Sequence, residues 1–238
     1  MADTTQFKLP LVQAAQAQKH VTVNEALARL DALAQVRLGS ISLVTPPVLV
    51  GDGEAYFVPV GAVNDWGGQV GQIAIYANGG WVFVPPAIGW HAYVVDIAKE
   101  AIFDGAKWRP EASALATGGA GTFHRVTEFD QIISAGTNIS TSVLIKNGQQ
   151  VIGVTGRVID AITGTGVTGW ELGVAASTNR YGSGLGIGKN SWLRGLSGTP
   201  VTYWADTPLV LTALGGNFAG GTVRLAIHSV ELEYPRTV

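Results

Sequence analysis

The residues of this chain best suited to binding a ligand lie between Arg180 and Trp204, where aromatic, basic and amide side chains occur close together. Aromatic rings stack on the apolar faces of sugars, and neighbouring polar groups bind the hydroxyls. The stretch 189–204 shows no strand periodicity, so we expect loops that carry a saccharide-binding surface. The candidate glycan-binding residues are Arg180, Tyr181, Asn190, Trp192, Arg194, Tyr203 and Trp204. Core packing remains the alternative for Trp192 and Trp204.

The composition argues against most catalytic chemistry. The chain has no cysteine, which excludes thiol nucleophiles, disulfides and thiolate metal sites. Its four histidines have no metal-ligand spacing, and no nucleophile-elbow or zinc-helix motif occurs. We therefore expect no metal, no cofactor and no enzymatic activity. Carboxylates such as Asp160, Glu171 and Asp206 leave a polysaccharide-cleaving enzyme open as an alternative.

The glycine-rich run 182–188 resembles a phosphate-binding loop at first sight. Its glycines alternate with other residues, and neither a Lys-Ser/Thr pair nor a helix signal follows. Alternating glycines predict a strand with one bare face, approached by another backbone or by the ring of Trp170 or Trp192.

One long segment, Gln16–Leu38, has helical periodicity. Thr22 is a candidate N-cap with Glu25 completing a capping box, and Gly39 is the expected stop. The apolar residues at helical spacing are Val23, Leu27, Leu30 and Ala34. Because no second helix is predicted, we expect this stripe to contact the same helix of another subunit and to drive oligomerisation.

The remaining sequence predicts a mainly β protein. Hydrophobic residues make up 47% of the chain, charged residues 13%, and there are 32 glycines. Trp81 and Trp108 follow turn signals and are expected in a small β core, and Asn78-Gly79-Gly80 and Asn147-Gly148 each predict a hairpin. The expected organisation is an N-terminal arm and helix (1–39), a small Trp-rich β-domain (40–110), a linker (111–121) and a jelly-roll-like antiparallel β-sandwich that binds the receptor (122–238).

Charge and hydropathy limit the partners and the location. A net charge of −2 gives no reason to expect nucleic acid. The N-terminal residues lack the apolar core of a signal peptide, and no apolar run is long enough to span a membrane. We therefore expect synthesis in the cytoplasm without membrane insertion.

Residues 9–33, LPLVQAAQAQKHVTVNEALARLDAL, resemble the domain-of-unknown-function 2793 family of tailed-phage and gene-transfer-agent structural proteins. Further similarity lies in a Pro-Pro pair, a Gly-rich turn with Trp66, and the Pro85-Pro86 pair with Gly89-Trp90, so that it covers roughly residues 5–110. The stretches GRVIDAITGTGVTGWELGV and NRYGSGLGIG resemble the β-sandwich that often follows this domain.

The resemblance implies a spike or fibre on the surface of a phage-like particle, such as a gene-transfer-agent head spike, that binds host cell-surface or capsular polysaccharide. It carries no catalytic residues to transfer. A homo-oligomer is expected, with a trimer favoured and a pentamer possible, and the N-terminal arm is expected to contact other particle proteins. The alternatives are a particle-associated depolymerase and a purely structural adaptor without glycan affinity.

Overall fold

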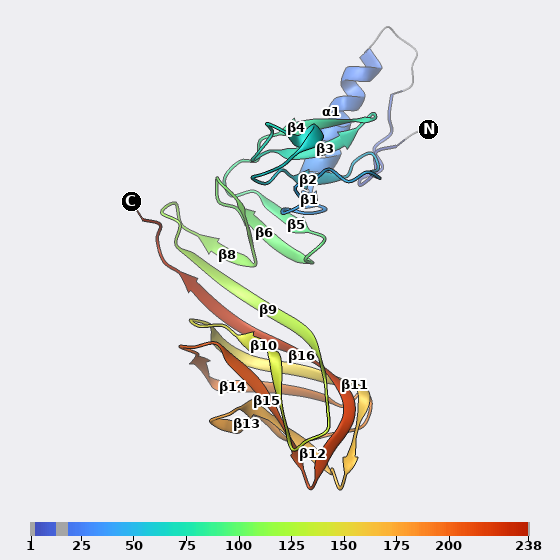
Figure 1. Ribbon diagram of the computed structural model, residues 1–238. Helices are drawn as coiled ribbons and strands as arrows, with labels where there is room; N and C mark the ends of the chain where they lie inside the picture. The colour runs from blue at the N-terminus through green and yellow to red at the C-terminus, as the bar shows by residue number, and fades with distance from the viewer. Residues whose placement is uncertain (1–2, 13–18, 238) are drawn as a thin grey trace. The chain divides into compact units, whose positions relative to one another are not determined.

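The computed structural model describes residues 3–12 and 19–237, and the chain forms two compact units, Met1–Thr117 and Gly118–Val238 (Figure 1). The first, unit 1, contains an N-terminal helix and short strands, and the second, unit 2, contains long antiparallel strands. The prediction of a mainly β protein with one N-terminal helix is confirmed. The finer jelly-roll prediction for the second unit remains a prediction.

Unit 1 is built around a seven-stranded sheet in the order β4-β3-β2-β1-β5-β6-β7. Its central strand β1 is parallel to β2 and β5, and the other neighbours are antiparallel. The elements of this unit are α1 (Lys19–Ala34), β1 (Arg37–Leu38), β2 (Ala55–Phe57), the 3-10 helix η1 (Asn64–Trp66), β3 (Ile73–Ala77), β4 (Gly80–Val84), β5 (His91–Val94), β6 (Lys99–Phe103), β7 (Trp108–Pro110) and β8 (Ala112–Leu115).

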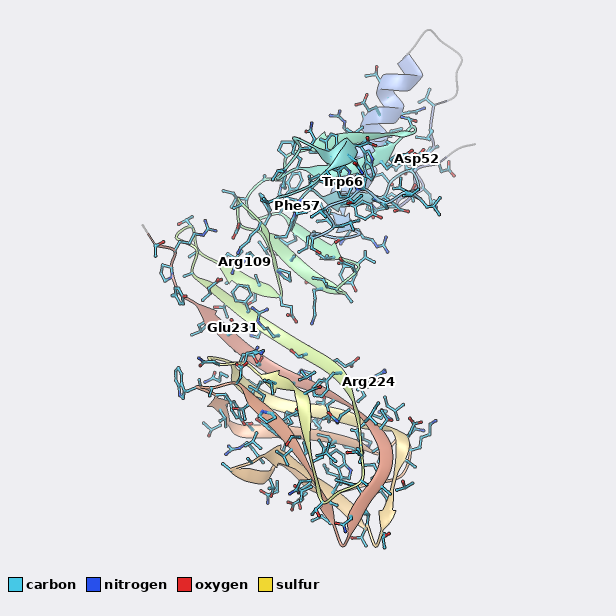
Figure 2. All side chains as sticks on the ribbon, viewed as in Figure 1. Asp52, Phe57, Trp66, Arg109, Arg224 and Glu231 are labelled. Carbon is cyan, nitrogen blue, oxygen red and sulfur yellow. The ribbon has the colours of Figure 1, made fainter. Side chains whose placement is uncertain are left out.

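Two hydrophobic clusters hold this unit together. The larger contains Leu38, Ile73 and Trp108, so the prediction that Trp108 lies in a core is confirmed. The second centres on Trp66, which Figure 2 labels, and includes Trp81 at its margin. The two indoles meet edge to face with centroids 5.3 Å apart. The hairpin predicted at Asn78-Gly79 is also present between β3 and β4.

Helix α1 differs from the prediction in its bounds and in the face that it buries. It begins before Thr22, so that Thr22 lies inside the helix and the prediction that it caps the helix is wrong. It ends at Ala34, and Leu38 belongs to β1. Residues 16–18 of the predicted segment lie outside the described residues. The most buried helix residues are Asp31 and Ala32, each 1% exposed.

The buried carboxylate of Asp31 explains why helix α1 turns this face inward. Asp31 accepts hydrogen bonds from the Thr4 hydroxyl at 2.7 Å and from the backbone N–H groups of Gln6 at 2.8 Å and Phe7 at 2.6 Å. Two turns earlier, Asn24 exchanges two hydrogen bonds with the backbone of Val12. The described part of the N-terminal arm, residues 3–12, is therefore bound to the polar face of its own helix.

The predicted oligomerisation stripe is consequently left uncovered. Val23, Leu30 and Ala34 are exposed, and Leu27 is half-buried. Their spacing of four, three and four residues is that of a coiled-coil seam. The contact with another subunit remains a prediction, since a single chain is described.

Unit 2 contains two antiparallel sheets. One has the order β10-β15-β12-β13, and in the other β14, β11, β16 and β9 follow one another. The bounds of these strands are β9 (Gly121–Ile132), β10 (Asn138–Ile145), β11 (Gln150–Thr165), β12 (Gly169–Val174), β13 (Ser177–Leu185), β14 (Trp192–Thr202), β15 (Thr207–Leu214) and β16 (Asn217–Glu233). Both sheets contribute to one buried cluster that includes Val154, Leu172, Leu211 and Leu225.

The hairpin predicted at Asn147-Gly148 is wrong. β10 pairs with β15, whereas β11 pairs with β14 and β16, so the turn connects two different sheets. Hydrogen bonds to the segment after β14 hold the Asn147-Gly148 turn in place. The Gly148 N–H donates to the Tyr203 carbonyl, and the Asn147 N–H donates to Asp206. A turn signal predicts that the chain reverses, and tertiary contacts decide whether the flanking strands pair.

Residues 111–121, which we expected to be a linker, contain β8 and the first residue of β9. Two of the four alternating glycines, Gly182 and Gly184, lie in β13, and the indole of Trp170 donates to the Gly186 carbonyl at 3.1 Å. Of the two rings proposed to approach this run, Trp170 is therefore in contact with it.

We predict that Asp31→Asn loosens the arm. Burial alone would raise the pKa of Asp31, but hydrogen bonds from Gln6, Phe7 and Thr4 outweigh it and lower this pKa below 3.8. The carboxylate therefore stabilises the folded state above about pH 4, and this contribution is lost as the pH falls through the lowered pKa. At neutral pH the substitution should cost unit 1 about 2 kcal/mol.

Hydrogen exchange of the Gln6 and Phe7 amides measures the effect directly. Both should exchange faster in Asp31→Asn, and the exposed Asp96→Asn serves as the matched control. Unchanged protection in Asp31→Asn would contradict the assigned role.

Candidate functional site

The outer face of the sheet formed by β14, β11, β16 and β9 arranges its side chains in rows. Residues paired across antiparallel strands point to the same side of a sheet. Arg157 of β11 pairs with Trp192 on one side and with Arg224 on the other, and Arg224 pairs with Asp130. Two residues along, a second row reads Arg194, Thr155, Ala226 and Glu128.

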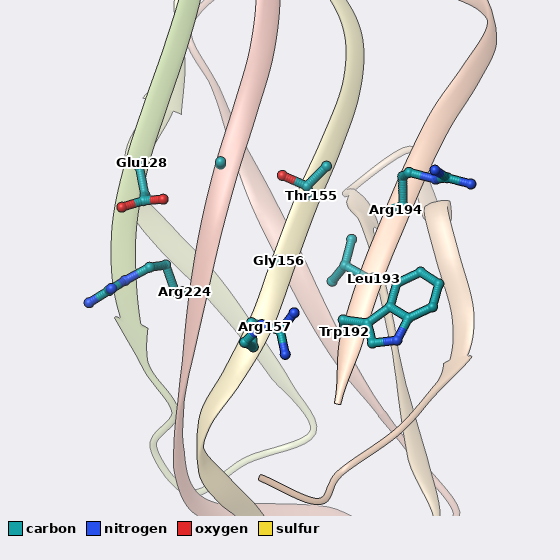
Figure 3. A pocket seen from close by; sticks show the side chains of 9 residues that line it. Glu128, Thr155, Gly156, Arg157, Trp192, Leu193, Arg194 and Arg224 are labelled. Atoms are coloured by element: carbon teal, nitrogen blue, oxygen red, sulfur yellow. The ribbon is translucent and has the colours of Figure 1, made fainter. Parts of the chain in front are cut away.

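These two rows line a hollow of about 550 Å³, which we call the trough. Figure 3 shows its side chains on four neighbouring strands, with Trp192 and Arg194 on β14 at one end and Glu128 and Arg224 at the other. The trough is lined by Glu128, Thr155, Gly156, Arg157, Trp192, Leu193, Arg194, Arg224 and Ala226.

The β14 end of the trough presents an aromatic ring beside free cations. The side chain of Trp192 is 66% exposed, although large apolar side chains are usually covered. Arg194 is exposed and forms no hydrogen bond or ion pair within the described part of the chain. Arg157 donates to the Asn190 carbonyl at 3.3 Å and meets no carboxylate there. This end can therefore stack on a ring and bind an anion.

The opposite end carries a different charge pattern. Arg224 binds Asp130 through two parallel hydrogen bonds, Nε to Oδ1 at 2.7 Å and Nη2 to Oδ2 at 2.8 Å. These bonds lower the pKa of Asp130, so the pair stays ionised and self-compensated at neutral pH. Glu128 forms no direct bond to an arginine among the described residues, but its charge attracts Arg224 and adds to the larger effect of Asp130 in raising the pKa of Arg224.

The structure brings together three of the seven predicted glycan-binding residues. Trp192 and Arg194 line the trough, and Asn190 lies beside it through its bond to Arg157. Trp204 is 81% exposed but follows the far end of β14. Trp192 pairs with Arg157 and Thr202 pairs with Gln150, seven positions away along β11, so at about 3.3 Å per position the two ends of β14 are roughly 23 Å apart. Arg180 is exposed on β13, which belongs to the other sheet.

Tyr181 and Tyr203 are core residues, which corrects their predicted exposure. They are 2% and 8% exposed, and their hydroxyls are hydrogen-bonded to each other at 2.8 Å. Burial, followed by the bond from Tyr203, raises the pKa of Tyr181 well above its usual value. A mutually satisfied buried pair has no free polar group for a ligand.

The prediction that residues 189–204 are loops is also wrong for most of that range, since Trp192–Thr202 form β14. Sequence reasoning missed Arg157, Thr155, Arg224 and Glu128 as site residues. The alternation of side chains along β11 and β16 could have predicted which face of the sheet these residues occupy. Only the pairing of the two strands shows that the residues lie next to one another.

Other kinds of site find little support in the described ranges. Residues 3–12 and 19–237 contain no group of three or more His, Asp or Glu side chains arranged to hold a metal ion. Within the same ranges, no helix has the length and apolar character needed to cross a membrane. His228 forms a 2.9 Å hydrogen bond with Thr155.

Comparison with known proteins identifies one family in unit 1. Residues 23–109 match the family described as "Protein of unknown function (DUF2793)". The resemblance to this family is thereby confirmed over this range, whereas its link to phage and gene-transfer-agent particles remains a prediction. The match ends before unit 2, where the trough lies.

The other comparisons add little. No curated protein matches the chain. Among solved structures, a chain described as "Cyanophage Pam1 capsid asymmetric unit" is 23% identical, and the alignment covers 47% of this chain and 84% of that chain. Its TM-score of 0.32 does not indicate a shared fold.

A substitution in the Tyr181–Tyr203 pair tests whether Tyr181 belongs to the hydrophobic core or to the binding site. Tyr181→Phe should lower the free energy of unfolding by about 1 kcal/mol, because it removes one buried hydrogen bond while keeping the ring. Denaturant unfolding measures this change. Saccharide binding at the trough should be unaffected, and a loss of binding with unchanged stability would return Tyr181 to the site.

Proposed function

We propose that this protein is a structural and adhesive component on the surface of a phage-like particle, a gene-transfer-agent or tailed-phage spike or fibre. In this proposal unit 2 binds host cell-surface or capsular polysaccharide, and unit 1 provides assembly. The family match over residues 23–109 supports the resemblance from which the particle assignment comes. The observation that carries the binding function is the exposed Trp192 beside the unpaired Arg194 in the trough.

The trough has the features that saccharide binding requires. An indole offers a flat apolar surface for the C–H face of a sugar, and guanidinium groups donate to hydroxyl and carboxylate oxygens. Both sit on paired strands, which hold them more rigidly than loops would. Sugars are therefore the ligand class that best matches this combination of ring, cations and small floor residues.

For assembly, we propose a homo-oligomer whose helices meet along Val23, Leu27, Leu30 and Ala34, with a trimer favoured over a pentamer. The coiled-coil spacing of the stripe supports the same helix of another copy as its partner. The arm faces its own helix through Asp31, and it leaves Phe7 and Val12 half exposed as apolar contacts for other particle proteins.

The proposal includes no enzymatic step. Glycoside hydrolysis generally uses two carboxyl groups on either side of the scissile bond. Asp130, which lies beside the trough, is held by Arg224, and Glu128 is the carboxylate among the described residues that line it. Binding without cleavage is the function that this arrangement favours.

Binding is tested on an array of purified capsular polysaccharides. The full chain should bind at least one of them, and Trp192→Ala should weaken that binding about tenfold or more, because central aromatic anchors dominate such contacts. Trp204→Ala, which removes an equally large exposed indole outside the trough, is the matched control and should bind as the parent does.

The other outcomes identify the alternatives. Shortened polysaccharide chains after incubation would indicate a depolymerase. Failure to bind any polysaccharide on the array would favour a structural adaptor.

Assembly is tested by light scattering during size-exclusion chromatography. Leu30→Glu should dissociate the oligomer, because a charge at the centre of an apolar seam is not compensated. Thr22→Glu introduces the same charge on the exposed side of the helix outside the seam and should leave the oligomer intact. A parent protein that is monomeric at micromolar concentration would contradict the role of the helix.

A further inference from the structure

We propose that the ligand of the trough is an acidic polysaccharide in which charged and neutral sugars alternate, with a uronate carboxylate bound at the β14 end. This inference rests on the proposed saccharide function and specifies the chemical class of its ligand. It follows from the distribution of charge across the two rows of residues.

The β14 end selects an anion. Arg157 and Arg194 flank Trp192 on the same face of the sheet, since Arg157 is its cross-strand partner and Arg194 lies two residues along its strand. Neither guanidinium is paired with a carboxylate among the described residues. A guanidinium binds a carboxylate through parallel hydrogen bonds, so a sugar acid stacked on Trp192 finds its counter-ion within reach.

The β9 end excludes an anion. Glu128 lies in the same row as Arg194, three strands away, and adjacent strands are spaced about 4.8 Å apart. The backbone positions of Arg194 and Glu128 are therefore roughly 14 Å apart across the sheet. A second carboxylate of the ligand at this distance would meet Glu128, whereas a neutral sugar can donate a hydroxyl to it.

The floor between these ends accommodates sugar rings. Thr155 and Ala226 occupy the middle of the row between Arg194 and Glu128, and both are small. The Thr155 hydroxyl is bound to His228, which fixes its position. Arg224 is restrained by its two bonds to Asp130 and forms the side of the trough. The ligand therefore lies across the strands.

The difference in charge between the two ends of the trough distinguishes alternating acidic glycans from continuous polyanions. Polyuronates with a charge on every sugar, and nucleic acids with a phosphate at every nucleotide, would place negative charge beside Glu128 as well as beside Arg194. Like charges at close range are destabilising. An alternating chain can place a uronate beside Arg194 and one of its neutral sugars beside Glu128, and it therefore satisfies both ends.

Four probes test this proposal on the full chain, each measured by titration calorimetry at the same ionic strength. Hyaluronan, in which glucuronate alternates with a neutral amino sugar, should bind. Methyl-esterified hyaluronan should bind at least tenfold more weakly, because its carboxylates are neutralised. Polygalacturonate and oligo-deoxythymidylate carry continuous charge and should also bind at least tenfold more weakly than hyaluronan.

Matched variants locate the effect. Arg194→Gln should weaken hyaluronan binding about tenfold, whereas Arg180→Gln, which removes an exposed arginine on β13, should not change it. Glu128→Gln should strengthen polygalacturonate binding and leave hyaluronan binding within about twofold. This gain cannot result from a folding defect.

The contrary results are distinct. If hyaluronan and its methyl ester bind equally, or if Arg194→Gln and Arg180→Gln behave alike, the acidic class is wrong while saccharide binding stands. If oligo-deoxythymidylate binds as tightly as hyaluronan, the ligand is a nucleic acid and the proposal is overturned. If hyaluronan fails to bind while a neutral polysaccharide on the array binds, this inference fails alone. If no saccharide binds, the proposed function fails with it.

Discussion

The pairing of β11 with β14 on one side and β16 on the other is the constraint on which the trough depends. The same register that turns Val154, Leu193 and Leu225 into the core turns Arg157, Trp192 and Arg224 outward in one row. A shift of one residue would exchange these two faces, so the hydrophobic core fixes the binding face indirectly. The positions of the charged groups are thus stabilised by residues that never meet a ligand.

In unit 1 the corresponding constraint is a buried polar contact. A helix normally buries its apolar stripe, yet here Asp31 and Asn24 face inward because they satisfy the backbone of the arm. Leaving a carboxylate buried without those partners would cost several kcal/mol. The arm and the helix therefore depend on each other. The apolar stripe of the helix stays uncovered by the arm and is available for contact with a partner outside the single chain.

The sequence alone predicted several features because their causes are local. Helical periodicity around Leu27 and the Asn78-Gly79 turn each act over a few residues. The failures involve long-range contacts. The orientation of α1 depends on Asp31 meeting residues 24 or more positions earlier, and Asn147-Gly148 joins two sheets because Tyr203 and Asp206 bind it. In the site, aromatic character identified Trp192, but it could not separate this exposed ring from the buried Tyr181 and Tyr203, since exposure is set by which strands pair.

The place of β14 at the edge of its sheet has a consequence for the way a long polymer is held. Among the described strands of this sheet, β14 pairs with β11 alone, so in the proposed function a polymer can extend past β14 and bind through an internal stretch. In the proposed function, every repeat of the polymer offers an equivalent site, and several copies of the protein on one particle bind one chain simultaneously. Under these conditions avidity replaces affinity, and a weak contact at each trough suffices to retain the particle while individual contacts exchange.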